Sequence, residues 1–180
     1  VHGAGPQATQ LTKRLGHEPI TIGGRRVTDG ATLEVMKMTL AGQVSIDVAA
    51  SMRIAKVPAL CTTGVSAGLV EATRRPPVVI TGGPPEPVDM GFVGDVTRVD
   101  VAAFERIAAA GFVPVLGSLC GDAAGAVFNV NADTVATRVA AALRAAKLFL
   151  VSSVPGVLAD KDDPKNRIPV LTPARAKEEI

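Results

Sequence analysis

Two asparagines and one aspartate crowd a five-residue segment, Asn129-Val130-Asn131-Ala132-Asp133, between a strand-like stretch and an alanine-rich helix. A helix cap accounts for one of these polar side chains, most simply Asn131. Asn129 is then available to donate a hydrogen bond to a polar group of a substrate. Asp133, in the first helical turn, can hold lysines or a metal ion in place. The segment therefore predicts a functional site rather than a plain helix start.

A glycine turn, His2-Gly3-Ala4-Gly5, leads from a strand end into a helix that starts near Pro6. Backbone N–H groups in such a turn, aligned with the helix dipole, form a ready site for an anion. Turns of this kind are also common where nothing binds. His2 itself fits a packed strand-end residue better than a catalytic base.

Two neighbouring arginines, Arg25 and Arg26, follow the Gly23-Gly24 turn of a predicted β-hairpin. A guanidinium group is the natural fork for a carboxylate. Because neighbouring residues of a strand point to opposite faces, we expect only one of the two to face a cleft. A solvated charge on the hairpin is the alternative interpretation.

The segment 152–156, Ser-Ser-Val-Pro-Gly, follows a predicted strand over residues 148–151. In parallel α/β sheets, ligands collect beyond the carboxyl ends of the strands. Two other polar or glycine-rich segments, 2–5 and 117–122, also occupy predicted strand ends. The convergence of all three favours a site at that edge more strongly than any one of them alone.

Composition limits the classes of function. The chain has 180 residues, a formal net charge of +2, 47% hydrophobic and 3% aromatic residues. With scattered basic residues and almost no aromatic platform, we expect no nucleic-acid partner. Cys61 and Cys120 form no CxxC pair and fit small buried side chains in a reducing compartment, so we expect no metal site at cysteine. No apolar run is long enough to cross a bilayer, and we expect a cytoplasmic protein with no membrane partner.

Helices and strands alternate along most of the chain. Asp29 is placed to cap a long helix with apolar residues at helical spacing. Other helices are predicted over 7–15, 101–110 and 132–146, and strands over 57–61, 69–73, 78–81, 91–99, 112–116 and 148–151. This alternation predicts an α/β fold with a mainly parallel sheet covered on both faces.

Both ends of the chain indicate a fragment. Val1 stands where the end of a strand is expected, and residues 174–180 are typical of a helix that is cut short. We therefore expect the fold to be incomplete at both ends.

The order of the motifs resembles acetylglutamate kinase, of the amino acid kinase family. The resemblance covers essentially the whole chain. It is carried by His-Gly-x-Gly-Pro at 2–6, Arg-Val-Thr-Asp at 26–29, Leu-Ala-Gly at 40–42, Gly-Phe-Val-Gly-Asp-Val at 91–96, Asn-x-Asn-Ala-Asp at 129–133 and Val-Pro-Gly-Val at 154–157.

The resemblance implies an αβα sandwich, with residues 1–130 forming mainly the amino-acid-substrate and dimer half. Residues 131–180 would begin the nucleotide-binding half. The long helix after Asp29 would be the interface of a homodimer or a higher homo-oligomer.

The resemblance also implies roles for the candidate residues. The N–H groups of Gly3, Ala4 and Gly5 would contact the substrate and the phosphoryl group in transfer. Arg26 would bind the α-carboxylate, and Asn129 the acylamino acid.

For the nucleotide half, the resemblance implies that Asp133 organises catalytic lysines. Ser152, Ser153 and Gly156 would border the site of ATP, which would bind with Mg²⁺. No metal site of the protein itself is expected.

The implied activity is ATP-dependent phosphorylation of the side-chain carboxylate of N-acetyl-L-glutamate to the acyl phosphate, in arginine biosynthesis. The attacking carboxylate is already ionised at neutral pH, so no general base is needed. The two lysines that neutralise phosphoryl charge in the family lie before and after this stretch, so we expect the 180-residue chain alone to be inactive.

Two alternatives stay open. An N-acylated 2-aminoadipate, a substrate of lysine biosynthesis, is only one methylene longer, which is worth about 1–3 kcal/mol in a pocket. The other alternative is a non-catalytic homologue that senses an amino acid. The chain departs from the family at Ala4, where the family has glycine, at Ser153, where it has aspartate, and over 62–68.

Overall fold

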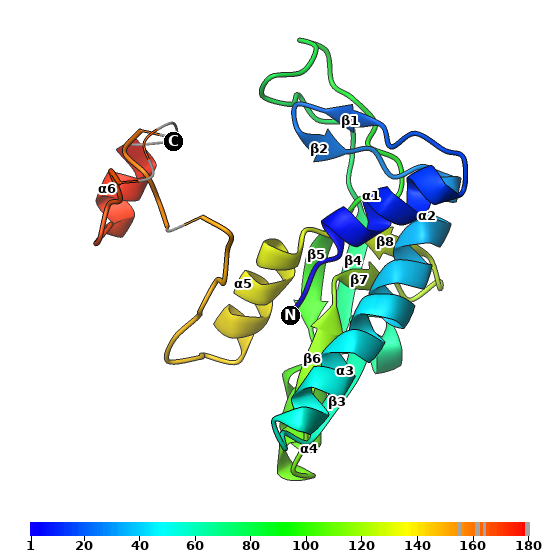
Figure 1. The fold of residues 1–180 in the computed structure, drawn as a ribbon, viewed down its shortest axis with the longest axis vertical. Helices are drawn as coiled ribbons and strands as arrows, with labels where there is room; N and C mark the ends of the chain where they lie inside the picture. The colour runs from blue at the N-terminus through cyan, green and yellow to red at the C-terminus, as the bar shows by residue number, and fades with distance from the viewer. Residues whose placement is uncertain (155, 161–162, 164, 179–180) are drawn as a thin grey trace. The chain divides into compact units, whose positions relative to one another are not determined.

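The computed structural model describes residues 1–154, 156–160, 163 and 165–178. It divides into two compact units, Val1–Leu148 and Phe149–Ile180. The first unit holds all the strands and most of the helices, and the second holds α6 (Pro173–Glu178) (Figure 1). In the described parts of the chain, no helix combines the length and the apolar character needed to cross a membrane.

The N-terminal part forms a helix and a small hairpin, as predicted. Helix α1 (Gly5–Arg14) begins directly after the glycine turn, with proline in its first turn. Strands β1 (Thr21–Ile22) and β2 (Arg25–Arg26) pair antiparallel around Gly23 and Gly24. Both glycines have positive φ, 53° and 73°, which a two-residue hairpin turn requires.

One continuous helical run follows, through α2 (Gly30–Lys37), a π-helical segment η1 (Met38–Val44) and α3 (Ser45–Ile54). Asp29 caps it by accepting a 2.7 Å hydrogen bond from the backbone N–H of Thr32, as expected. Leu33, Met36, Leu40 and Val44 are buried. The long helix that the sequence predicts after Asp29 is confirmed.

Besides the β1–β2 hairpin, the strands form two sheets. β3 (Ala59–Thr63) pairs in parallel with β6 (Val113–Gly117), and His2 joins Gly117 through a parallel bridge. The larger sheet has the order β5 (Gly94–Val99), β4 (Val70–Arg74), β7 (Leu119–Gly121) and β8 (Val127–Asn129). In it β4 and β7 are parallel, while β4–β5 and β7–β8 are antiparallel. The short 3₁₀ turn η2 (Ser66–Gly68) precedes β4.

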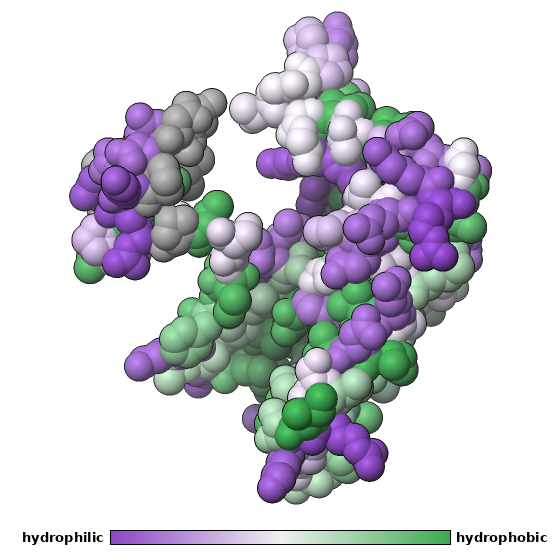
Figure 2. Space-filling view, viewed as in Figure 1, coloured by the Kyte–Doolittle hydropathy of each residue, from purple (hydrophilic) through white to green (hydrophobic). Residues whose placement is uncertain are grey.

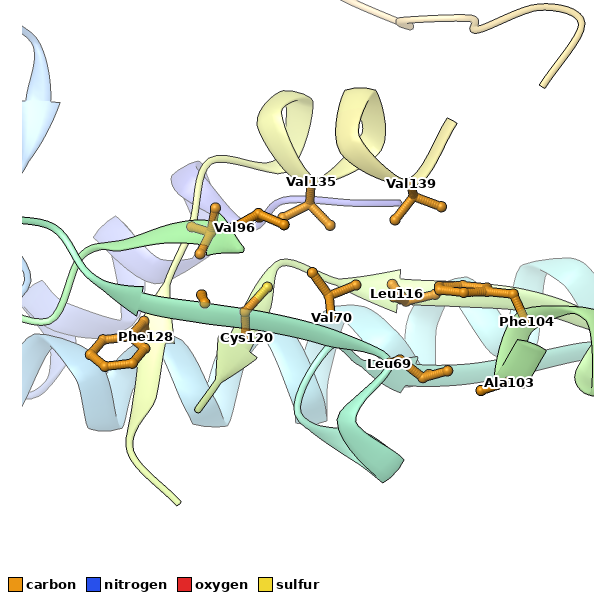
Figure 3. Packing of buried hydrophobic residues seen from close by; sticks show 12 residues of the cluster. Leu69, Val70, Val96, Ala103, Phe104, Leu116, Cys120, Phe128, Val135 and Val139 are labelled. Carbon is orange, nitrogen blue, oxygen red and sulfur yellow. The ribbon is translucent and has the colours of Figure 1, made fainter. Parts of the chain in front are cut away.

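Helices cover both faces of the strands, which confirms the predicted α/β class. α5 (Ala132–Ala142) packs over one face through Val135 and Val139, and the run from α2 to α3 lies on the other side (Figure 3). α4 (Val101–Ala109) contributes Ala103 and Phe104 to the same core. This core is largely aliphatic; the residues labelled in Figure 3 are Leu69, Val70, Val96, Ala103, Phe104, Leu116, Cys120, Phe128, Val135 and Val139.

Two predicted strands do not form, and one predicted helix ends earlier than expected. Residues 78–81 make a single bridge, between Val78 and Val88, instead of a strand. The helix expected over 132–146 ends at Ala142, and Arg144 takes a positive φ of 49°. Residues 148–151 form no strand, and Phe149 and Val151 are 79% and 99% exposed. Both mispredicted strands are short apolar runs without a ladder of partners in the described chain.

Candidate functional site

A cleft of about 580 Å³ opens in the first unit where the start of α1, the β1–β2 hairpin and the β8–α5 junction meet. It brings together Gly5, Arg26 and Asn129, three predicted substrate-binding residues that are far apart in the sequence. The residues that line it are Gly5, Gly24, Arg25, Arg26, Arg75, Met90, Val93, Asn129, Val130, Asn131 and Thr134.

Arg26 is held against the start of α1. Its Nη2 donates to Thr9 Oγ1 at 2.7 Å and to the carbonyl of Gly5 at 3.2 Å. Its Nη1 is buried and has no hydrogen-bond partner in the described structure. Burial lowers the pKa of Arg26, but an arginine stays charged in proteins. A buried, charged N–H without an acceptor is costly, and Arg26 is also one of the residues that line the cleft.

Asn129 is tied to the arginine hairpin through a buried threonine. Its Nδ2 donates to Thr28 Oγ1 at 3.1 Å, and Thr28 is completely buried. The segment 91–93 links the two sides: the N–H of Phe92 donates to the Thr28 carbonyl at 2.6 Å, and the N–H of Asn129 donates to the Phe92 carbonyl at 2.8 Å. These contacts fix the end of β8 relative to Thr28, which lies two residues after Arg26.

The glycine turn lies at the same end of the molecule. No side chain caps α1, so the first N–H groups of this helix have no side-chain partner in the described structure. Ala4 has φ −148° and its methyl group is buried in the core with Ala8 and Leu33. The alanine therefore causes no backbone strain at this place. A Cβ added to Gly3 would lie 3.4 Å from Ala132 Cβ, so the turn also approaches the start of α5.

His2 is a packed strand-end residue, as predicted. Its backbone N–H donates to the Leu116 carbonyl at 2.8 Å, and its ring Nε2 lies 3.4 Å from Ser45 Oγ. Burial is the main cause that lowers the pKa of the His2 imidazole.

At the start of α5, Asn131 is the cap that the sequence predicted, since its side chain accepts from the N–H of Thr134 at 3.0 Å. Asp133 is exposed in the first turn and borders a separate shallow hollow of about 270 Å³. Thr134 borders both the hollow and the cleft. Asp133 is thus adjacent to the cleft but is not among the residues that line it.

The cleft is strongly basic. Three arginines line it, and among the described lining residues none is acidic. Arg25 and Arg26 both border it, although strand alternation predicted only one. The sequence analysis did not identify Arg75, which directly follows β4 and precedes Pro76-Pro77. Its signal was a second arginine pair beside a predicted strand end.

A basic cleft beside an uncapped helix start suits a small anionic substrate. Comparison with known families shows which family has this fold. Residues 1–179 match the model of the amino acid kinase family. The chain belongs to this family.

Its relatives include several acetylglutamate kinases. It is 49% identical over 177 residues to that of Sorangium cellulosum (strain So ce56), and 51% identical over 174 residues to that of Anaeromyxobacter dehalogenans (strain 2CP-C). These matches cover 98% and 97% of the chain but only 62% and 64% of the relatives. The acetylglutamate kinase of Methanopyrus kandleri is 44% identical, over 99% of the chain and 71% of the relative.

Solved structures of similar fold include smu.665 from Streptococcus mutans UA159, with a TM-score of 0.75 and 29% identity over 87% of this chain and 60% of that one. Another is N-acetylglutamate synthase from Neisseria gonorrhoeae complexed with coenzyme A and N-acetyl-glutamate. Its TM-score is 0.60 at 28% identity, over 79% of this chain and 31% of that one. The predicted resemblance to the amino acid kinase family and the predicted α/β fold class are thereby confirmed.

The predicted nucleotide residues of the amino acid kinase chain, Ser152, Ser153 and Gly156, belong to the second unit. The strand expected before them is absent, and all three are exposed. Pro155 lies outside the described residues. Across the described residues, no three His, Cys, Asp or Glu side chains gather as a metal site.

Proposed function

We propose that the protein catalyses ATP-dependent phosphorylation of the side-chain carboxylate of N-acetyl-L-glutamate, giving the acyl phosphate in arginine biosynthesis. The observation that carries the proposal is the single basic cleft that holds Gly5, Arg26 and Asn129. The names of the relatives support the same substrate class. Because the chain spans under two thirds of those relatives, the activity is assigned to the protein expressed from its complete coding sequence.

In the proposed reaction, the protein positions an anion and stabilises charge. Arg26 binds the α-carboxylate, with its unpartnered Nη1 as the donor that gains most from the contact. Asn129, anchored by Thr28, binds the acylamino group. The amides of Gly3, Ala4 and Gly5 stabilise the charge of the phosphoryl group in transfer.

The nucleotide side of the proposal involves Asp133, which organises lysines supplied by the complete protein, and Ser152, Ser153 and Gly156, which border ATP. Mg²⁺ typically binds through nucleotide phosphates and one or two carboxylates. The exposed Asp133 carboxylate has oxygen atoms that can coordinate that ion or accept hydrogen bonds from a lysine.

We also propose that the outer face of the long helical run forms a homodimer contact. Met38, Ile46 and Ile54, which all lie on this run, are large apolar side chains that are 50%, 67% and 85% exposed. Hydrophobic side chains reach the surface at the lower end of α3 in the space-filling view (Figure 2).

The test is a coupled ADP-release assay on the complete protein, with N-acetylglutamate and N-acetyl-2-aminoadipate as parallel substrates. We expect turnover that favours N-acetylglutamate. A preference for the longer substrate would assign the protein to the lysine-pathway alternative. Binding of either compound without ADP release would support a sensor. The glycine-to-alanine change at Ala4 no longer favours the sensor, because its methyl group points into the core.

A further inference from the structure

Arg75 directly follows the last residue of β4 and lines the cleft together with Met90 and Val93. Its Nε and Nη2 both donate to Asp95 Oδ1, at 3.0 and 2.6 Å. Nη1 has no hydrogen-bond partner in the described structure. The side chain is only 22% exposed, so the guanidinium group is both largely covered and oriented.

The backbone of Arg75 is also fixed. Its N–H donates to the carbonyl of Val93 at 2.8 Å, and Val93 is itself a lining residue. Pro76 follows directly and restricts Arg75 to extended conformations. A cation in this position loses little conformational entropy when an anion binds.

We propose that Arg75 is a positioning and specificity residue, which adds a second oriented guanidinium group to the cleft and so favours doubly charged acylamino acids over singly charged ones. Asp95 is the positioning partner that orients it. This inference rests on the proposed function, because an N-acylated acidic amino acid carries two carboxylates. Arg26 neutralises one charge, and Arg75 raises the affinity of the cleft for the dianion.

The same pair of strands offers a matched control. Arg98 on β5 pairs with Glu71 on β4 at 2.7 Å, and neither residue is among those that line the cleft. Arg98→Gln therefore removes an arginine–carboxylate pair from the β4–β5 ladder without changing the charge at the cleft.

The experiment compares wild type, Arg75→Gln and Arg98→Gln in the complete protein. We expect Arg75→Gln to raise the KM for N-acetylglutamate about tenfold or more, with the KM for ATP within about twofold of wild type. N-acetylglutamine, which lacks the second carboxylate, serves as a competitive inhibitor. The Ki for N-acetylglutamine should change much less than the KM for N-acetylglutamate. The preference of Arg75→Gln for the dianion should therefore be smaller than that of wild type. Arg98→Gln should behave as wild type in all three measurements.

Arg75→Lys keeps the positive charge but not the planar guanidinium group, and we expect its KM for N-acetylglutamate to lie between those of wild type and Arg75→Gln. If Arg75→Gln fails to fold, Arg75→Lys is the variant that is compared with Arg98→Gln. The inference is overturned if the Arg75 variants match Arg98→Gln, or if they weaken N-acetylglutamine and N-acetylglutamate equally. Absence of turnover in wild type would instead refute the proposed function.

Discussion

Arg26 combines a buried charged N–H that has no acceptor among the described residues with an orientation that is fixed by Thr9. Such a residue gains more from an anionic ligand than a solvated arginine does, because its desolvation cost has already been met in the folded protein.

Arg26→Ala should therefore raise the KM for the acylamino acid by about tenfold to a hundredfold and leave the KM for ATP nearly unchanged. Steady-state kinetics with each substrate varied in turn measures both values. Arg14→Ala, at the exposed end of α1, is the control. Equal losses for the two substrates would remove the role assigned to Arg26.

Gly91 secures the contact between the arginine hairpin and the strand of Asn129. It has φ 74°, and a Cβ there would lie 2.2 Å from the carbonyl oxygen of Thr28. Gly91→Ala should cost roughly 3 kcal/mol or more in the free energy of unfolding. Gly125→Ala tests the backbone effect alone, since Gly125 has φ 89° and no atom within 4 Å of the added Cβ; about 1–2 kcal/mol is expected. Urea unfolding of both variants should show this difference, and similar values would contradict the steric account.

At the scale of elements, the sequence predicted turns and helix caps correctly but predicted two strands that do not form. The Gly23-Gly24 turn, the Asp29 cap and the Asn131 cap each depend on a few neighbouring residues, and all three are confirmed. A strand requires a partner that its own sequence does not specify, which explains the errors over 78–81 and 148–151. The Arg74-Arg75 pair was a local signal for a basic site, but only the folded chain shows that Arg75 lies at the cleft.

Asp29 provides a test of the long helix. Hydrogen bonds from Thr32, chiefly from its backbone N–H, lower the pKa of the Asp29 carboxyl group. The unfolded chain therefore takes up this proton more readily, and the contribution of the ionised cap is present above about pH 4 and lost as the pH falls through the lower folded pKa.

Asp29→Ala should lower the free energy of unfolding by about 1 kcal/mol at pH 7, whereas Asp29→Asn should keep most of it. Urea titrations at pH 7 and pH 3 measure both effects. The advantage of wild type over Asp29→Ala should shrink at the lower pH. An advantage that is unchanged at pH 3 would argue against an ionised cap.

At the scale of the whole molecule, the cleft depends on segments 100 residues apart along the chain, so the site could be proposed from motif order but its geometry could not. The exposed apolar residues of the helical run belong to the proposed dimer contact and do not line the cleft. Ile46→Asp should convert a dimer to a monomer in light scattering coupled to size-exclusion chromatography. Val79→Asp, at an exposed position away from that run, should not. A monomeric wild type would contradict the proposed contact.

The most direct test of the account is an experimental structure of the complete protein with N-acetylglutamate bound. The account predicts the ligand in the cleft, with a carboxylate against the Nη1 side of Arg26 and the acylamino group within hydrogen-bonding distance of Asn129. A ligand bound elsewhere, with the Arg26 Nη1 still unpaired, would contradict it.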